Sequence, residues 1–326
     1  MAAIAANILL ALAVVACGGS STPSSLGSRI GPALAAAFAA ADRERAPWRC
    51  ASADGPTLVD ETLQLGDRTW KLAGHAVTYS GTSPVAIGVI ADAGGAAPAT
   101  IAALGRLRSL LDAVDVVIAL GGMGATQAEL EATLGTLAER PTRLLVAIPG
   151  DLESVAAQAA AIAALRARGR IVIDGRLARR IELPGVTIAT VPGAIAATRL
   201  FAGADGCGYR AGDVAALLGD LAGRPNLRVL ACAEAPRVRS GGEPAGELAL
   251  TPAHEIDVVL HGPVGDRGSP ARSGVRDGGR TPLTPGTSDA TTRLPGPRRA
   301  PSAGVLTVDR DGWSWKLLVD APPTDR

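Results

Sequence analysis

Acidic side chains follow two apolar segments that are suited to be strands. Asp92 ends the segment VAIGVIAD (85–92), and Asp151 ends RLLVAIPGD (143–151), with Glu153 two residues further on. Three carboxylates, completed by water molecules, could hold one Mg²⁺ or Ca²⁺ ion. Asp92 and Asp151 could instead cap helix N-termini or accept hydrogen bonds from turn amides. Both interpretations predict that these residues lie at strand ends.

Glycine runs at 94–95 and 121–124 also follow such segments, the second after VDVVIALGG (114–122). They precede helical sequence and could bind an anion through backbone amides. They match neither the dinucleotide-binding GxGxxG pattern nor the phosphate-binding GxxxxGK[ST] pattern, so tight turns are the better interpretation. His75 and His254 have no evident partner, and no Cys/His spacing suggests zinc.

Helical sequence separates these apolar segments. Ile101, Leu104, Leu107 and Leu111 repeat at helical spacing within 99–113. Thr126 and Glu129 predict a capping box, and a third helix is expected at 153–168 with Gly169 at its end. Strands that alternate with amphipathic helices predict a parallel sheet buried on both faces, whose ligands bind at the carboxyl ends of the strands.

The flanking sequence predicts more strands. Two or three are expected within 60–80, and a β-meander is expected over 170–191. A helix is predicted over 213–223 with Asp213 as its N-cap. Two strands are expected at 227–232 and 256–261. A long flexible loop rich in Gly, Pro and Arg is expected at 262–302, and two closing strands are expected at 304–309 and 313–319.

The order of the strand ends resembles that of the calcineurin-like metallophosphoesterases. That family carries D-x-H, G-D, G-N-H-[DE], a lone His and G-H-x-H, and the resemblance covers roughly residues 84–319. It implies an α/β fold in which a two-sheet β-sandwich is flanked by helices. The corresponding segments here begin at Asp92, Gly121, Gly150, Ala233 and Gly262.

Most of the metal ligands that the resemblance implies are replaced. Asp92 matches the Asp of the family's D-x-H motif. Gly122 stands where the family has an Asp that bridges two metal ions, which lie about 3.5–4 Å apart in such sites. Asp92, Asp151 and Glu153 are therefore vestigial metal-ligand candidates, and no catalytic residue is assigned. The remaining replacements of family histidines are Gly94, Leu152, Ala233, Pro263 and Gly265.

The N-terminus resembles a bacterial lipoprotein signal. An apolar run at 4–16 ends in small residues before Cys17, the residue that would be lipidated, although 1–7 contains no Lys or Arg. A plain secretory signal is the alternative. The expected division is a signal peptide at 1–17, a tether, helix and strands at 18–83, and the phosphoesterase-like domain at 84–319. The protein is expected in the cell envelope, anchored to the membrane and facing the periplasm or exterior.

Cysteine usage and charge constrain the partners. Cys50 and Cys207 lie in polar, loop-like contexts and are expected to pair, while Cys232 lies in apolar sequence and reads as a buried thiol. The net charge of +1, from 32 basic and 31 acidic residues, gives no basis for nucleic-acid binding. No protein partner is identified.

Three functional hypotheses follow. The first is a lipid-anchored pseudo-phosphoesterase with a binding or structural role and no cofactor. The second is an active phosphoesterase that uses a reduced site for a divalent metal (Mn, Fe, Zn or Mg). The third is a solute-binding lipoprotein, against which the meander and closing strands argue, because two similar α/β lobes would be expected there.

Overall fold

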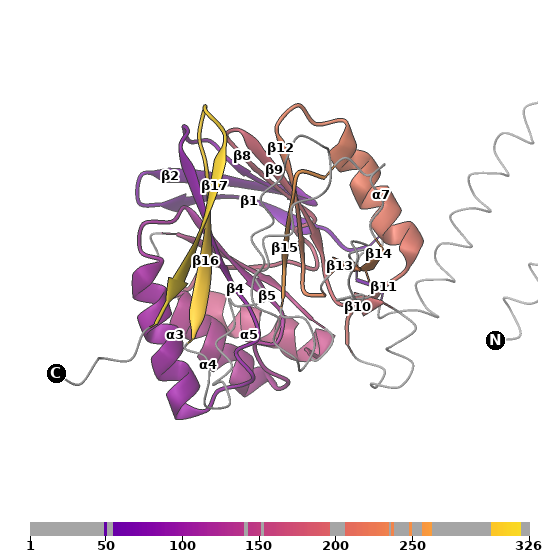
Figure 1. Ribbon diagram of the computed structural model, residues 1–326. Helices are drawn as coiled ribbons and strands as arrows, with labels where there is room; N and C mark the ends of the chain where they lie inside the picture. The colour runs from indigo at the N-terminus through magenta and orange to yellow at the C-terminus, as the bar shows by residue number, and fades with distance from the viewer. Residues whose placement is uncertain are drawn as a thin grey trace, which may run out of the picture. The chain divides into compact units, whose positions relative to one another are not determined.

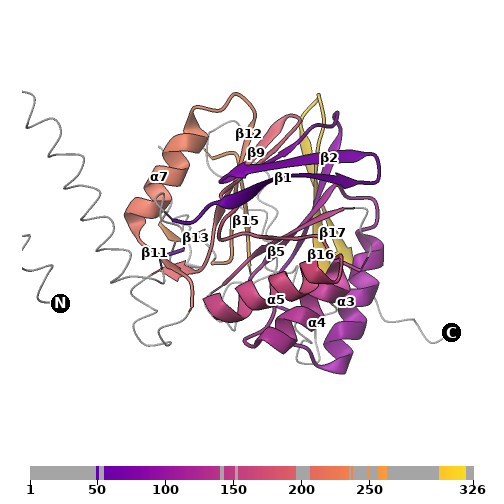
Figure 2. The same ribbon diagram turned by 180° about the vertical axis from the view of Figure 1, so that it is seen from behind.

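The computed structural model shows two β-sheets packed face to face, with helices on their outer faces (Figures 1 and 2). The two-sheet α/β fold expected from the sequence is therefore confirmed. Within the described residues, no helix is long and apolar enough to span a membrane. The structure describes residues 49–50, 55–139, 143–150, 153–195, 206–234, 236–237, 248–249, 256–262 and 301–320.

One sheet has six strands in the order β17-β16-β4-β5-β6-β7. The segments from β4 to β7 pair in parallel, and the closing hairpin β16–β17 adds antiparallel beside β4. The parallel pairing predicted for β4, β5 and β6 is confirmed. The bounds are Val85–Ile90 (β4), Val116–Leu120 (β5), Leu144–Ile148 (β6), Val172–Asp174 (β7), Ser302–Val308 (β16) and Trp313–Val319 (β17).

The second sheet has seven strands in the order β1-β2-β3-β8-β9-β12-β15. Two-stranded pairs of Ala194–Ile195 (β10) with Gly208–Tyr209 (β11), and of Pro236–Arg237 (β13) with Leu248–Ala249 (β14), lie apart from it. The seven strands are Leu58–Leu65 (β1), Arg68–Gly74 (β2), Ala76–Tyr79 (β3), Arg180–Leu183 (β8), Val186–Val191 (β9), Leu227–Cys232 (β12) and Val258–His261 (β15).

Two expectations about chain organisation need correction. The segment 170–173 does not open a meander, because β7 pairs in parallel with β6 in the first sheet. The predicted boundary at residue 84 also divides a sheet, because β3 pairs with β8. In both cases the pairing partner is set by hydrogen bonds between segments distant in sequence, which local pattern does not reveal.

In the part of the chain that the structure describes, three helices cover the six-stranded sheet and one covers the seven-stranded sheet. Figure 1 shows their arrangement. The capping box at α4 is confirmed: Thr126 Oγ1 accepts from the Glu129 amide at 3.3 Å, and the Glu129 carboxylate accepts from the Thr126 amide at 3.1 Å. Gly169 ends α5 at φ 75°, as predicted. The bounds are Pro98–Leu110 (α3), Gln127–Leu137 (α4), Val155–Ala167 (α5) and Ala211–Ala222 (α7).

Asp213 is not the N-cap of α7, as the sequence suggested. The helix begins two residues earlier, with Arg210 as the N-cap, and Asp213 accepts a hydrogen bond from the Arg210 amide at 2.9 Å. Asp213 is therefore the third helical residue, whose side chain accepts from the N-cap amide, and not the N-cap itself.

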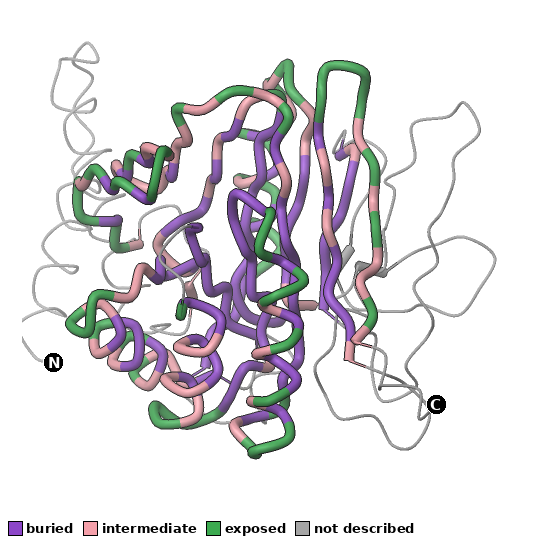
Figure 3. Tube along the Cα trace, turned by 90° about the vertical axis from the view of Figure 1, so that its left-hand side faces the viewer, coloured by how far each residue is buried: buried purple, intermediate pink, exposed green. Residues whose placement is uncertain are grey.

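The main core fills the space between the sheets (Figure 3). It is built from aliphatic side chains of both sheets and from Trp70, which stacks on Tyr79 with ring centroids 4.7 Å apart. Smaller apolar clusters seat the helices on each outer face. The carboxyl ends of the parallel strands are left at one edge of this scaffold, where a site would be built.

Candidate functional site

Backbone hydrogen bonds join the loops at the carboxyl ends of β4, β5 and β6. The Asp92 amide donates to Gly121 O and the Gly94 amide to Gly122 O, each at 2.8 Å. The Gly121 amide in turn donates to Ile148 O at 2.8 Å. These loops therefore continue the sheet beyond its strands and leave the edge closed by main chain.

The same closure extends to the second sheet. The Gly193 amide, beyond β9, donates to Pro149 O at 2.7 Å, beyond β6. A side chain at Gly262, after β15, would place its Cβ 2.4 Å from Ala233 O, after β12. Strand-end loops of both sheets thus approach one another at main-chain contact distance.

Gly122 occupies the position where the resemblance implies a bridging aspartate. A Cβ placed there would lie 2.7 Å from Asp92 Cα and 2.8 Å from Asp92 Oδ1. At neighbouring Gly121, a Cβ would lie 2.7 Å from both N and Cα of Gly150. Both glycines have φ 67°, which other residues rarely adopt. The loop after β4 therefore fills the space that a bridging side chain would need.

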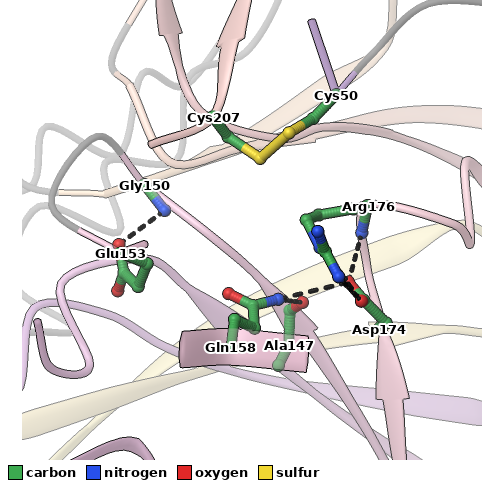
Figure 4. Close-up of a disulfide and its surroundings, with 8 residues drawn as sticks. All are labelled: Cys50, Ala147, Gly150, Glu153, Gln158, Asp174, Arg176 and Cys207. Carbon is green, nitrogen blue, oxygen red and sulfur yellow. Dashed lines mark hydrogen bonds and ion pairs between the residues drawn. A yellow bond between two sulfur atoms is a disulfide. The ribbon is translucent and has the colours of Figure 1, made fainter. Parts of the chain in front are cut away.

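Glu153 is committed to the backbone. Its side chain is buried, with only 1% of the residue exposed. One carboxylate oxygen accepts from the Met123 amide at 2.7 Å. The other accepts from the Gly150 amide at 2.8 Å, the hydrogen bond drawn in Figure 4. Glu153 thereby ties the loop after β5 to the loop after β6, a structural role that the sequence analysis did not assign to this residue.

The other two acidic candidates are Asp92, which the structure describes, and Asp151, which it does not. Asp92 is buried beside Gly122, with φ 55°, and the N-cap of α3 is Ala97, so Asp92 does not cap that helix. Asp151 lies outside the described residues. In the part of the chain that is described, no group of three His, Cys, Asp or Glu residues could hold a metal ion. The described residues thus do not fit the two-metal centre that the resemblance implies.

The ends of β12 and β15 hold a buried pair, Cys232 and His261, which are register partners. His261 Nδ1 lies 2.6 Å from Gly262 O, and burial lowers the pKa of His261 to about 4. Burial raises the pKa of the Cys232 thiol. A neutral imidazole beside a protonated thiol lacks the thiolate that nucleophilic catalysis requires.

Tyr209 and Glu234 form a contact that the sequence did not indicate. The Tyr209 hydroxyl donates to the Glu234 carboxylate, next to Ala233, where the family carries its lone histidine. Tyr209 is buried and belongs to the cluster under α7. Its partner is 25 residues away in sequence, and no local pattern links the two.

The Cys50–Cys207 pair forms a disulfide, as the sequence led us to expect, with Cα atoms 5.5 Å apart. Figure 4 shows it on the same side of the sheet as Gly150 and Glu153, and Gly206, next to Cys207, forms a β-bridge with Ser154. The Cys50 amide donates to Gly208 O at 3.2 Å, and Arg49 forms an ion pair with Asp213. The segment 49–50 is thus fixed to the domain next to the closed strand ends.

Comparisons with known proteins bear on the fold alone. No family model matches the chain, and no curated protein does. One crystal structure aligns with 73% of this chain and 100% of its own, at 13% identity and a TM-score of 0.50. The protein TT1561 of Thermus thermophilus aligns with 73% of this chain and 99% of its own, at 14% identity and a TM-score of 0.46.

A third solved structure is the purple acid phosphatase PPD1 from yellow lupin seeds. It aligns with 77% of this chain and 56% of its own, at 10% identity and a TM-score of 0.47. Phosphatase activity is a property of the lupin protein. At such identities, what the chain shares with solved structures is its fold, a mixed α/β arrangement of two sheets flanked by helices.

Proposed function

We propose that this chain is a phosphoesterase-like scaffold without two-metal catalysis, which acts through binding or structure in the cell envelope. Its attachment to the membrane would be a lipid on Cys17. That anchoring is inferred from the sequence at 4–17 alone, which lies outside the described residues.

The absence of space at Gly122 is the observation that carries the catalytic part of this proposal. A two-metal phosphoesterase needs a carboxylate bridging both ions. Here a Cβ at Gly122 would lie 2.7 Å from main-chain Cα of Asp92, and no flexible side chain can yield to relieve that contact. Glu153, the nearby acidic candidate, already accepts from two backbone amides. A metal at Glu153 would therefore have to share both carboxylate oxygens with the Met123 and Gly150 amides.

Metal titration and hydrolysis assays test the proposal against an active enzyme with a reduced site. We expect no saturable Mn²⁺ binding by calorimetry and no hydrolysis of bis(p-nitrophenyl) phosphate above the buffer rate. Metal-dependent hydrolysis that Asp92→Asn removes would overturn the proposal. The surface variant Glu131→Gln serves as the matched control, because Glu131 lies within α4 and pairs with exposed Arg168 rather than with the strand-end loops.

Anchoring needs its own experiment. In a bacterial host that lipidates envelope proteins, the wild-type chain should incorporate labelled palmitate and Cys17→Ser should not. Secretion of an unlabelled wild-type chain would instead support the plain secretory signal and remove the anchor from the proposal.

A further inference from the structure

The outer edge of β17 is an open strand edge. β17 pairs with β16 along its whole length, and no described strand pairs with its other side. Along the strand, Ser314 and Lys316 are exposed, whereas Trp313, Trp315 and Leu317 are half-buried. An edge of this kind presents free N–H and C=O groups, together with alternating side-chain faces, to an added strand.

Aromatic side chains are concentrated on this edge. The chain has four tryptophans, of which Trp313 and Trp315 lie on β17. The Trp315 ring lies over Gly304 of β16, so close that a Cβ at Gly304 would come within 2.1 Å of it. Trp313 and Trp315 both pack against the core between the two sheets, which restricts the positions of their rings. Rigid, half-buried tryptophans supply large contact area at little entropic cost, and they are enriched at binding hot spots.

A groove of about 550 Å³ adjoins the beginning of β17. It lies between the β16–β17 turn and the starts of β12 and β15, and Trp313 and Arg310 line it. Its other charges are largely satisfied: Arg228 pairs with Asp257 at 3.1 Å, and Asp309 accepts from two turn amides. Arg310 is exposed, and no described residue forms an ion pair with it.

Charge distinguishes between possible occupants of the edge. Lys316 is at the centre of β17 and, like Arg310, has no ion-pair partner among the described residues. If a second copy added its own β17 antiparallel over the full strand, Lys316 would face Lys316. Like charges directly opposite destabilise a strand pair, whereas opposite charges stabilise it. The edge therefore suits a foreign strand that carries acidic side chains.

We propose that the outer edge of β17 binds an extended acidic peptide segment of another protein by strand addition. Its apolar side chains would pack on Trp313, Trp315 and Leu317, and its alternate acidic side chains would meet Lys316 and Arg310. Main-chain hydrogen bonds supply affinity in this mode, and alternate side chains supply specificity. The inference rests on the proposed binding role and names the class of partner.

The probe is an acetylated, amidated octapeptide of four Glu-Val repeats, and binding to the full chain is followed by calorimetry and tryptophan fluorescence. We expect saturable binding and a fluorescence change. Lys316→Glu should weaken binding by at least about fivefold, since it exchanges an attractive cross-strand pair for a repulsive one. It should also favour the corresponding Lys-Val peptide. Lys71→Glu, at the chain's other lysine on β2, is the matched control and should leave binding unchanged.

Two N-methylated Glu-Val peptides separate strand addition from simple charge attraction. One is methylated on its valine amides and the other on its glutamate amides, and at least one should lose binding. The proposal would be overturned if both methylated peptides bound as tightly as the unmethylated peptide. It would also be overturned if Lys71→Glu and Lys316→Glu weakened binding of the Glu-Val peptide equally. A dimer of the chain, seen by sedimentation, that excludes the peptide would overturn it as well. These results are independent of the metal and hydrolysis assays, so the two proposals can fail separately.

Discussion

At the scale of single residues, a buried carboxylate has a structural role at a position where the sequence resemblance implies a metal ligand. Glu153 lies in the acidic position that the sequence singles out, and its two oxygens hold the amides of Met123 and Gly150. Anionic acceptors form stronger hydrogen bonds with backbone amides than neutral ones do. The sequence singles out Glu153 as a metal-ligand candidate, and only the fold shows that its oxygens accept hydrogen bonds from two backbone amides.

Replacing Glu153 tests this role. Glu153→Ala leaves two amides without their acceptor at a site that is only 1% exposed. We expect the free energy of unfolding to fall by about 3 kcal/mol, since each buried donor left unsatisfied costs roughly 1–3 kcal/mol. Urea denaturation measures the change. Glu131→Ala removes an exposed ion pair with Arg168 and an exposed hydrogen bond from Gln127, and it should cost about 1 kcal/mol or less. Equal losses in the two variants would contradict the assignment.

His261 should make stability depend on pH. Burial lowers its pKa from 6.5 to about 4, so the unfolded chain takes up a proton at a higher pH than the folded chain. Stability contributed by the neutral imidazole is therefore complete above about pH 6.5 and declines as the pH falls toward about 4. The expected loss is on the order of 3 kcal/mol. Unfolding free energies at pH 7 and pH 5 should differ less in His261→Gln than in the wild type, and an unchanged difference would refute the prediction.

At the scale of elements, local sequence is informative where the contacts are local. The capping box at α4 spans three residues, and the glycine that ends α5 requires a positive φ, so both can be predicted from adjacent positions. Asp213 shows the limit of this reasoning. An acidic residue suits either the N-cap or the third helical position, and the sequence suggested the wrong one.

The capping box offers a test on one helix. Thr126→Ala removes the side chain that accepts from the Glu129 amide, and we expect a loss of about 1 kcal/mol in unfolding free energy. Backbone hydrogen bonds from Thr126 and Ala125 lower the pKa of Glu129. The stability that the ionised Glu129 carboxylate contributes is consequently present above its ordinary pKa of 4.5 and is lost as the pH falls below that value. Thermal melts at pH 7 and pH 3.5 should show a smaller effect of Thr126→Ala at the lower pH.

At the scale of the whole molecule, one covalent link spans most of the domain. Cys50 and Cys207 are 157 residues apart, and their disulfide fixes the segment before β1 beside the strand ends. Cross-links that close long loops stabilise by restricting the unfolded chain. A chain whose core contains so few aromatic side chains gains from such a restriction.

Removing the disulfide should destabilise the whole domain. The double variant Cys50→Ala, Cys207→Ala is expected to lose about 4 kcal/mol, within the range for a loop of this length. Wild-type protein treated with reductant should lose a similar amount in chemical denaturation. Cys232→Ala is the control, because Cys232 is a free, buried cysteine, and its melt should still respond to reductant. A double variant as stable as the wild type would show that the link contributes nothing.

The sequence by itself determined the strands and helices of the parallel unit, because their periodicity and end signals arise from contacts within a few residues. It also determined which loops follow the strands and how poor they are in metal ligands. The tertiary structure decided how β3, β7 and β12 pair, since hydrogen bonds between distant strands leave no local pattern. It also decided the state of the site. The space at Gly122 depends on how closely two separate loops approach. A Cβ placed at Gly122 would lie 2.7 Å from Asp92 Cα, which leaves no room for a bridging side chain.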